Sequence, residues 1–205
     1  MKTVWSLSTC LLLALPAAAQ WGKKIKGNGN MVTVERSVGS YDEVALSGWF
    51  DLELVSGKEG ELTLRGEENL LEHIKTEVKN GKLTVKTEKG YNLQPSSWKS
   101  GGIKIVVPVE EINAVTMSGS GDIVGKTKLK ADNFDVVMSG SGDITLEIEG
   151  GSIESTLSGS GDIRLSGRTD QFSVKISGSG DIHAYDLEAN NVDAVVSGSA
   201  DIKVT

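Results

Sequence analysis

Cysteine is nearly absent from the 205-residue sequence, and proline, histidine and aromatic residues are scarce as well. The one cysteine, Cys10, lies in an N-terminal apolar segment that we expect to be removed. The mature protein would then have no disulfide, no thiolate metal site and no cysteine nucleophile. Only two histidines, His73 and His183, could act as general bases, and no Gly-x-Ser-x-Gly motif is present. The sequence therefore predicts a protein that is not an enzyme.

Basic residues are outnumbered by acidic ones. The chain has 21 Lys and Arg residues against 28 Asp and Glu residues, a formal net charge of -7. This balance disfavours the binding of a polyanion, so we expect no nucleic-acid partner. The hydrophobic content of 38% is still enough for a packed core. Glycine, in contrast, is abundant at 25 residues, and its distribution decides what kind of fold the chain forms.

Residues 1–19 have the pattern of a secretory signal peptide. Lys2 supplies the basic start, residues 7–15 form a short apolar segment, and residues 17–19 form an Ala-x-Ala cleavage site. No later apolar segment is long enough to span a membrane. We expect an exported Gram-negative protein in the periplasm, on the cell surface or in the medium. A linker at 20–27 would be followed by a single domain at 28–205.

A hexapeptide repeat accounts for much of the glycine. The sequence Ser-Gly-Ser-Gly-Asp-Ile occurs at 118–123, 139–144, 158–163 and 177–182, and Ser-Gly-Ser-Ala-Asp-Ile occurs at 197–202, with spacings of 21, 19, 19 and 20 residues. A period near 20 is typical of a solenoid built from short repeated units, which we call coils. Residues 101–205 would be regular coils and residues 28–100 degenerate ones.

The residues around each motif alternate with period two, which predicts β-strands. Apolar residues share one parity with both glycines of the motif, so these point inward, whereas the two serines and the aspartate point outward. The fold prediction is all-β, a right-handed parallel β-helix with one short helix at 67–74 and an irregular N-terminal half. Asn80-Gly81 predicts a hairpin turn, and residues 90–102 a long exposed loop.

The inward glycines are predicted to be structural, because a side chain at a corner would collide with the core of the adjacent coil. They are Gly119, Gly121, Gly140, Gly142, Gly159, Gly161, Gly178 and Gly180.

The outward aspartates are the strongest candidates for binding a metal ion. They are Asp122, Asp143, Asp162, Asp181 and Asp201. Stacked carboxylates repel one another, and a bound Ca²⁺ would relieve that repulsion. The alternative, which we favour, is that each aspartate caps its turn by accepting backbone N–H groups. No other cofactor is expected.

Three aromatic residues are candidate ligand-binding residues. Trp49 lies in a degenerate coil, and Tyr91 and Trp98 lie in the predicted loop, where they could stack on sugar rings or anchor a partner. Filling of the core is the alternative. A polysaccharide-degrading site would need two carboxylates in different environments, and the repeated aspartates have identical ones.

The order of motifs resembles a known family. Gly27-Asn28-Gly29-Asn30, Leu46-Ser47-Gly48, Gly66-Glu67-Glu68-Asn69 and the SGSGD repeats are similar to the head GIN domain of autotransporter adhesins, which is abundant in Bacteroidetes. The resemblance implies an exported β-helical protein of the cell envelope. It carries no catalytic residues over to this chain.

The function that we expect is an exported, non-enzymatic adhesin that presents a polar repeat face to a cell-surface or extracellular glycan or protein. The alternatives are a polysaccharide-binding or polysaccharide-degrading β-helix protein and a Ca²⁺-stabilised structural module. The sequence ends on a predicted strand at 201–205, and exposed strand edges favour pairing. We therefore expect either an end-to-end homo-oligomer or a cap formed by residues 90–102.

Overall fold

The computed structural model describes residues 22–97 and 102–204. The fold is all-β with one short helix, as the sequence predicts. A two-stranded sheet pairs β1 with β8, and the other 14 strands form one curled sheet. The predicted signal peptide at 1–19 and Trp98 lie outside the described residues. Among the described residues, no helix is both long and apolar enough to cross a membrane.

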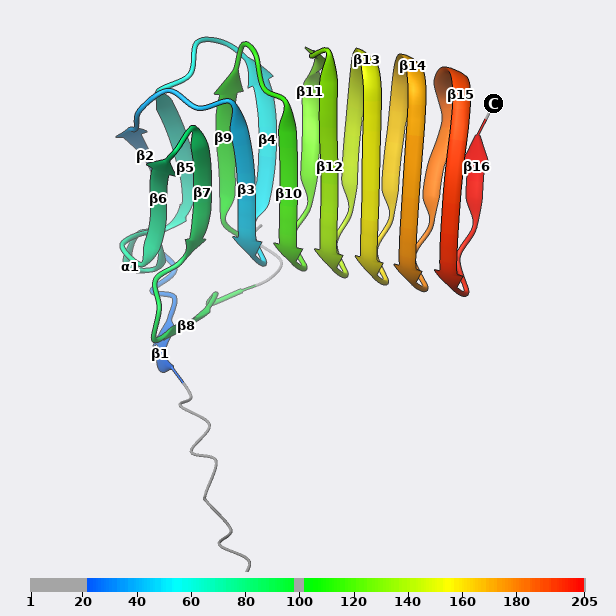
Figure 1. Cartoon of the computed structure of the whole chain (residues 1–205). Coiled ribbons are helices and arrows are strands. Elements are labelled where there is room, and N and C mark those ends of the chain that lie inside the picture. Colours follow the sequence, from blue (N-terminus) through cyan, green and yellow to red (C-terminus); the bar gives the residue numbers. More distant parts are fainter. Residues whose placement is uncertain (1–21, 98–101, 205) are drawn as a thin grey trace, which may run out of the picture.

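The regular half is a stack of parallel-paired strands (Figure 1). Each strand pairs with its counterpart in the next repeat, so that Ser139 lies beside Ser158 and Ser158 beside Ser177. The motif copies are therefore aligned along the stack, as a 20-residue repeat requires. The strands are β10 (Ala114–Gly119), β11 (Ile123–Lys130), β12 (Asn133–Gly140), β13 (Ile144–Gly159), β14 (Ile163–Gly178), β15 (Ile182–Gly198) and β16 (Ile202–Val204).

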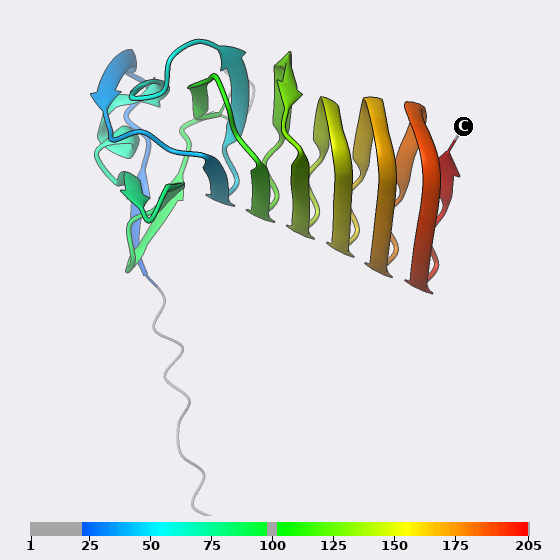
Figure 2. The ribbon, with the colours of Figure 1, turned by 45° about the horizontal axis from the view of Figure 1, so that its top comes forward.

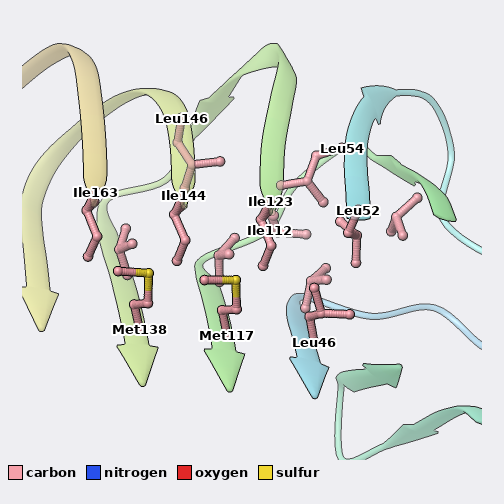
Figure 3. Packing of buried hydrophobic residues seen from close by; sticks show 14 of the residues in the cluster. Leu46, Leu52, Leu54, Ile112, Met117, Ile123, Met138, Ile144, Leu146 and Ile163 are labelled. Atoms are coloured by element: carbon pink, nitrogen blue, oxygen red, sulfur yellow. The ribbon is translucent and has the colours of Figure 1, made fainter. Parts of the chain in front are cut away.

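The core lies between two faces of the stack (Figure 3). Ile123, Ile144 and Ile163 point from one face toward Met117 and Met138 on the other. These five side chains are fully buried, which agrees with the inward parity of the sequence. Asn113 has the inward parity as well but is exposed, so the prediction fails there. It also fails at Val192, Ala194 and Val196, which share this parity and are exposed because they belong to the last coil.

The motif glycines form the corners of the coils. A Cβ atom on Gly140 would lie 1.8 Å from the carbonyl oxygen of Gly119 in the preceding coil, and one on Gly142 would lie 1.8 Å from the oxygen of Gly121. Gly140 also has a φ of 151°, which side chains disfavour. Glycine is therefore required at these corners, although the colliding atoms belong to the neighbouring backbone and not to core side chains as predicted. The same contact recurs at Gly119, Gly121, Gly159, Gly161, Gly178 and Gly180.

The N-terminal half only partly follows the prediction of degenerate coils. β3 (Glu43–Gly48) and β4 (Asp51–Ser56) do form one more coil, because β3 pairs in parallel with β10, and β4 with β11 and β9 (Lys104–Val109). β2 (Met31–Ser37) and β5 (Glu61–Glu67) instead pair antiparallel, as do β6 (Ile74–Lys79) and β7 (Lys82–Thr87). The β2–β5 pair and the β6–β7 hairpin lie at the end of the stack opposite β16 (Figure 2).

The β6–β7 hairpin and the short helix both lie where the sequence predicts them. Asn80 and Gly81 both have positive φ angles, 52° and 79°, which is the geometry of a tight hairpin turn and confirms the turn predicted there. The helix α1 (Glu68–Leu71) lies within the predicted span and buries Leu70 and Leu71.

The predicted loop at 90–102 is wrong for its first part. Residues 91–94 form the strand β8 (Tyr91–Gln94), which pairs in parallel with β1 (Lys23–Lys26) and buries Leu93. The alternation of Tyr91 and Leu93 with polar residues favours a strand there. Because β8 lies beside β1, far from β16 in Figure 1, residues 90–97 do not cap the last coil.

Candidate functional site

The repeated aspartates form a ladder of hydrogen bonds between coils. The backbone N–H of Asp143 donates to Oδ1 of Asp122 (3.0 Å), and that of Asp162 donates to Oδ1 of Asp143 (3.1 Å). The same bond joins Asp181 to Asp162 (3.2 Å) and Asp201 to Asp181 (2.8 Å). The carboxylates of Asp122, Asp143, Asp162 and Asp181 thus each accept a backbone N–H of the next coil. The acceptor role agrees with the favoured prediction, but the donor belongs to the next coil and not to the aspartate's own turn.

The ladder begins at Asp51, in the coil formed by β3 and β4. Oδ1 of Asp51 accepts the backbone N–H of Asp122 at 3.3 Å. Loss of solvation raises the pKa of the Asp51 carboxyl above its ordinary value, although this backbone hydrogen bond acts in the opposite direction. The degenerate motif Ser47-Gly48-Trp49-Phe50-Asp51 was the signal for this residue in the sequence.

Arg164 neutralises part of the ladder. Its guanidinium donates to Oδ2 of Asp143 and to Oδ2 of Asp162, both at 2.9 Å. Ligand atoms of Asp162, Asp181 and His183 lie within 4.8 Å of one another, a spacing that a metal ion could use. However, both oxygens of Asp162 already accept hydrogen bonds. The Ca²⁺ assignment for the five aspartates stays a prediction, and an unchanged melting temperature in EDTA would remove it.

The predicted aromatic ligand residues lie in two separate packing contacts. Trp49 is half-buried, with its ring centroid 5.2 Å from that of Phe50, and it covers Gly102. Tyr91 stacks on His73 with centroids 4.1 Å apart, and Nδ1 of His73 lies 3.2 Å from Oε2 of Glu88. These contacts support the alternative that the two rings fill packing positions. The third residue, Trp98, is outside the described residues.

Two shallow hollows lie along the edge of the stack away from the SGSGD turns. The turn between β11 and β12 lies at this edge (Figure 1). One hollow, of about 530 Å³, is lined by Asp42, Glu111, Asn113 and Asp135, and the other, of about 640 Å³, by Glu149, Gly150, Arg168 and Asp170. Both also include residues 130–132 and are therefore contiguous. We call them together the charged groove.

The charged groove was not predicted from the sequence. The residues that its two hollows share include the turn at 130–132, which belongs to the 21-residue coil. In the same coil, β11 departs from regular pairing with β13 between Val124 and Lys128. The other spacings between motif copies are 19 and 20 residues. The longer repeat was the signal in the sequence, since extra residues must be accommodated at an edge of the stack.

A third hollow, of about 240 Å³, lies on β13, β14 and β15. It is lined by Thr145, Leu146, Arg164, Leu165, Ser166, His183, Tyr185 and Asp186. Tyr185 is 55% exposed. No pattern in the sequence singled out this tyrosine.

Comparison with known proteins places the chain among adhesin-like proteins. The family described as "Putative auto-transporter adhesin, head GIN domain" matches residues 40–205. A solved structure described as a putative lipid binding protein, from Parabacteroides distasonis, has a TM-score of 0.72 and 27% identity over 89% of this chain and 85% of that one. No protein of curated function matches the sequence.

Two further solved structures, both described as putative adhesins, share the fold. The one from Bacteroides fragilis has a TM-score of 0.79 and 24% identity, over 88% of this chain and 82% of that one. The one from Parabacteroides distasonis has a TM-score of 0.66 and 22% identity, over 89% and 84%. The all-β architecture is therefore shared along most of the chain.

Proposed function

This chain belongs to the family of putative auto-transporter adhesins with a head GIN domain, and from that premise we propose that it is an exported, non-enzymatic binding protein. Its partner is a cell-surface or extracellular glycan or protein, held along the polar surface of the stack. The apolar run and Ala-x-Ala site at 1–19 support export.

The charged groove is the observation that carries this proposal. It is shallow and contiguous across consecutive coils, and it is lined by acidic, basic and amide side chains. Enzyme sites for small substrates are usually concave pockets with a few convergent polar groups among apolar ones. An extended polar surface on a rigid backbone instead fits a macromolecular ligand, whose many weak contacts add up over its length.

We also propose that the stacked coils form a right-handed parallel β-helix. The parallel register of β10, β12, β13, β14 and β15 and the in-line motif copies support this arrangement. The hand follows from the strong preference of parallel crossover connections. Such a stack has little freedom to bend, because each corner glycine contacts the backbone of the coil before it.

The test is an array of glycans and extracellular-matrix proteins, probed with residues 20–205. We expect binding to at least one class of ligand, weakened by Asp132→Lys in the charged groove. The matched control is Glu61→Lys, which makes the same change of charge on the exposed surface of β5. A wild-type protein that binds nothing on the array, or one whose binding falls equally in both variants, would contradict the proposal. Lipid vesicles on the same array test the description given to the P. distasonis neighbour.

A further inference from the structure

An extra residue in β15 changes the pattern of exposed side chains. β14 and β15 pair at Arg164 with His183 and again at Ser166 with Asp186, so β15 has one residue more than β14 in this interval. As a result Tyr185 and Asp186 are consecutive exposed residues, flanked by the buried Ala184 and Leu187. Bulges of this kind commonly aim a side chain at a ligand.

The bulge places an aromatic ring at the wall of the third hollow. Among the described residues, Tyr185 is the most exposed aromatic side chain, at 55%. Ser166 and Thr145, from the two preceding coils, line the same hollow with hydroxyl groups. An aromatic ring beside hydroxyl and carboxylate groups is the combination that recognises a sugar, whose ring has an apolar face and polar edges.

The charges around the hollow favour a neutral ligand. Arg164 is held by the carboxylates of Asp143 and Asp162, and Nε2 of His183 lies 3.7 Å from Oδ2 of Asp162. The guanidinium of Arg164 is thus balanced by carboxylates, and Asp186 adds a negative charge at the wall. The carboxylate of Asp186 would repel an anionic sugar, whereas the hydroxyl groups of a neutral sugar can donate to it.

We propose that the hollow at Tyr185 binds one neutral pyranose ring of a glycan. The ring stacks on Tyr185, and its hydroxyl groups bond to Asp186 and Ser166. The volume of about 240 Å³ suits a single ring of a longer chain that continues over the surface. This inference rests on the proposed binding function and names the chemical class of its ligand.

Saturation-transfer NMR on residues 20–205 tests the site with three probes: the methyl glycosides of glucose, galactose and mannose. We expect transfer to the ring C–H protons of at least one, and roughly tenfold weaker binding in Tyr185→Ala. Tyr185→Phe retains the aromatic face and should keep most of the transfer. The control is Val137→Ala, which shortens an exposed apolar side chain of β12 (37% exposed).

Three results would overturn the site. They are the absence of transfer to all three probes, equal transfer in wild type and Tyr185→Ala, and equal losses in Tyr185→Ala and Val137→Ala. The array separates this failure from failure of the proposed function. If Tyr185→Ala binds the array as the wild type does, the proposed binding function stands, but the proposed sugar site at Tyr185 is wrong. If the wild-type protein binds nothing on the array, the function itself fails.

Discussion

Single residues at the corners of the coils determine how closely the chain can stack. The distance between neighbouring strands leaves no room for a Cβ atom at Gly140, where it would meet the carbonyl oxygen of Gly119. A backbone atom cannot move aside as the end of a flexible side chain can. Stability therefore depends on these glycines more than on any outward residue of the motif.

Gly140→Val should destabilise the protein by more than about 3 kcal/mol, since steric overlap adds to the strain of a side chain at positive φ. Urea unfolding followed by circular dichroism measures the change. Gly39→Val is the matched control, because a Cβ atom on Gly39 would have no atom of the described residues within 4 Å. Equal losses in the two variants, or a stable Gly140→Val protein, would refute the assignment of Gly140 as a packed corner.

Ser155 is a second residue whose environment makes a sharp prediction. It is fully buried, and its hydroxyl has no hydrogen-bond partner among the described residues. It is in register with Val136 and Val174 of the adjacent coils. Ser155→Val should therefore stabilise the protein by about 1–2 kcal/mol, because it removes an unsatisfied polar group and adds apolar contact. The midpoint of thermal unfolding measures the effect. A lower midpoint would mean that the hydroxyl has a partner or that the site is too small.

At the scale of elements, the aspartate ladder links one coil to the next through side chain and backbone. Only one oxygen of each carboxylate takes part in the ladder. An asparagine can accept the same N–H bond through its amide oxygen. The negative charge is thus dispensable for the bond between coils, while the acceptor is required.

Asp143→Asn should cost less than about 1 kcal/mol, since it keeps the acceptor and loses only the exposed ion pair with Arg164. Asp143→Ala should cost more, about 1–2 kcal/mol, because the N–H of Asp162 loses its partner. Urea unfolding of the two variants side by side gives the comparison. If asparagine is as damaging as alanine, the charge itself matters, and a bound cation becomes the better account of the ladder.

The strands also show which features of the fold the sequence can predict and which it cannot. The period-two pattern identified the buried residues of β12 and β14, because one side of each strand faces a continuous core. The antiparallel pairing of β2 with β5 was missed, since alternation does not encode strand direction. Tyr185 was missed because a bulge depends on the pairing partner, and a 20-residue spacing alone does not locate it.

At the scale of the whole molecule, the two ends of the stack differ. At one end, β7 and β9 cover the coil formed by β3 and β4. At the other end, β15 pairs with β16 along only three residues, and Val192, Val195 and Val196 are exposed. A long strand with an exposed apolar surface is a site for pairing with another chain. We therefore expect two copies to meet end to end through their last coils, which is one of the two arrangements predicted from the sequence.

Sedimentation velocity should show a dimer that dissociates on dilution, and Val195→Lys should shift the protein to monomer without changing its melting temperature. Lysine at this position introduces charge repulsion across a symmetric contact. Val137→Lys is the control, since Val137 is exposed on β12 in the interior of the stack. A protein that stays monomeric at all concentrations would exclude the end-to-end contact.

The SGSGD repeats form the corners of one stack of paired strands. Native-state amide hydrogen exchange tests it most directly, because the N–H groups of Ser141, Ser160 and Ser179 each donate to a glycine carbonyl of the preceding coil. The account predicts that these three amides exchange only through global unfolding, at the rate of the core strands. If they exchange as fast as the amides of an exposed turn, the repeats are not stacked corners and the account is wrong.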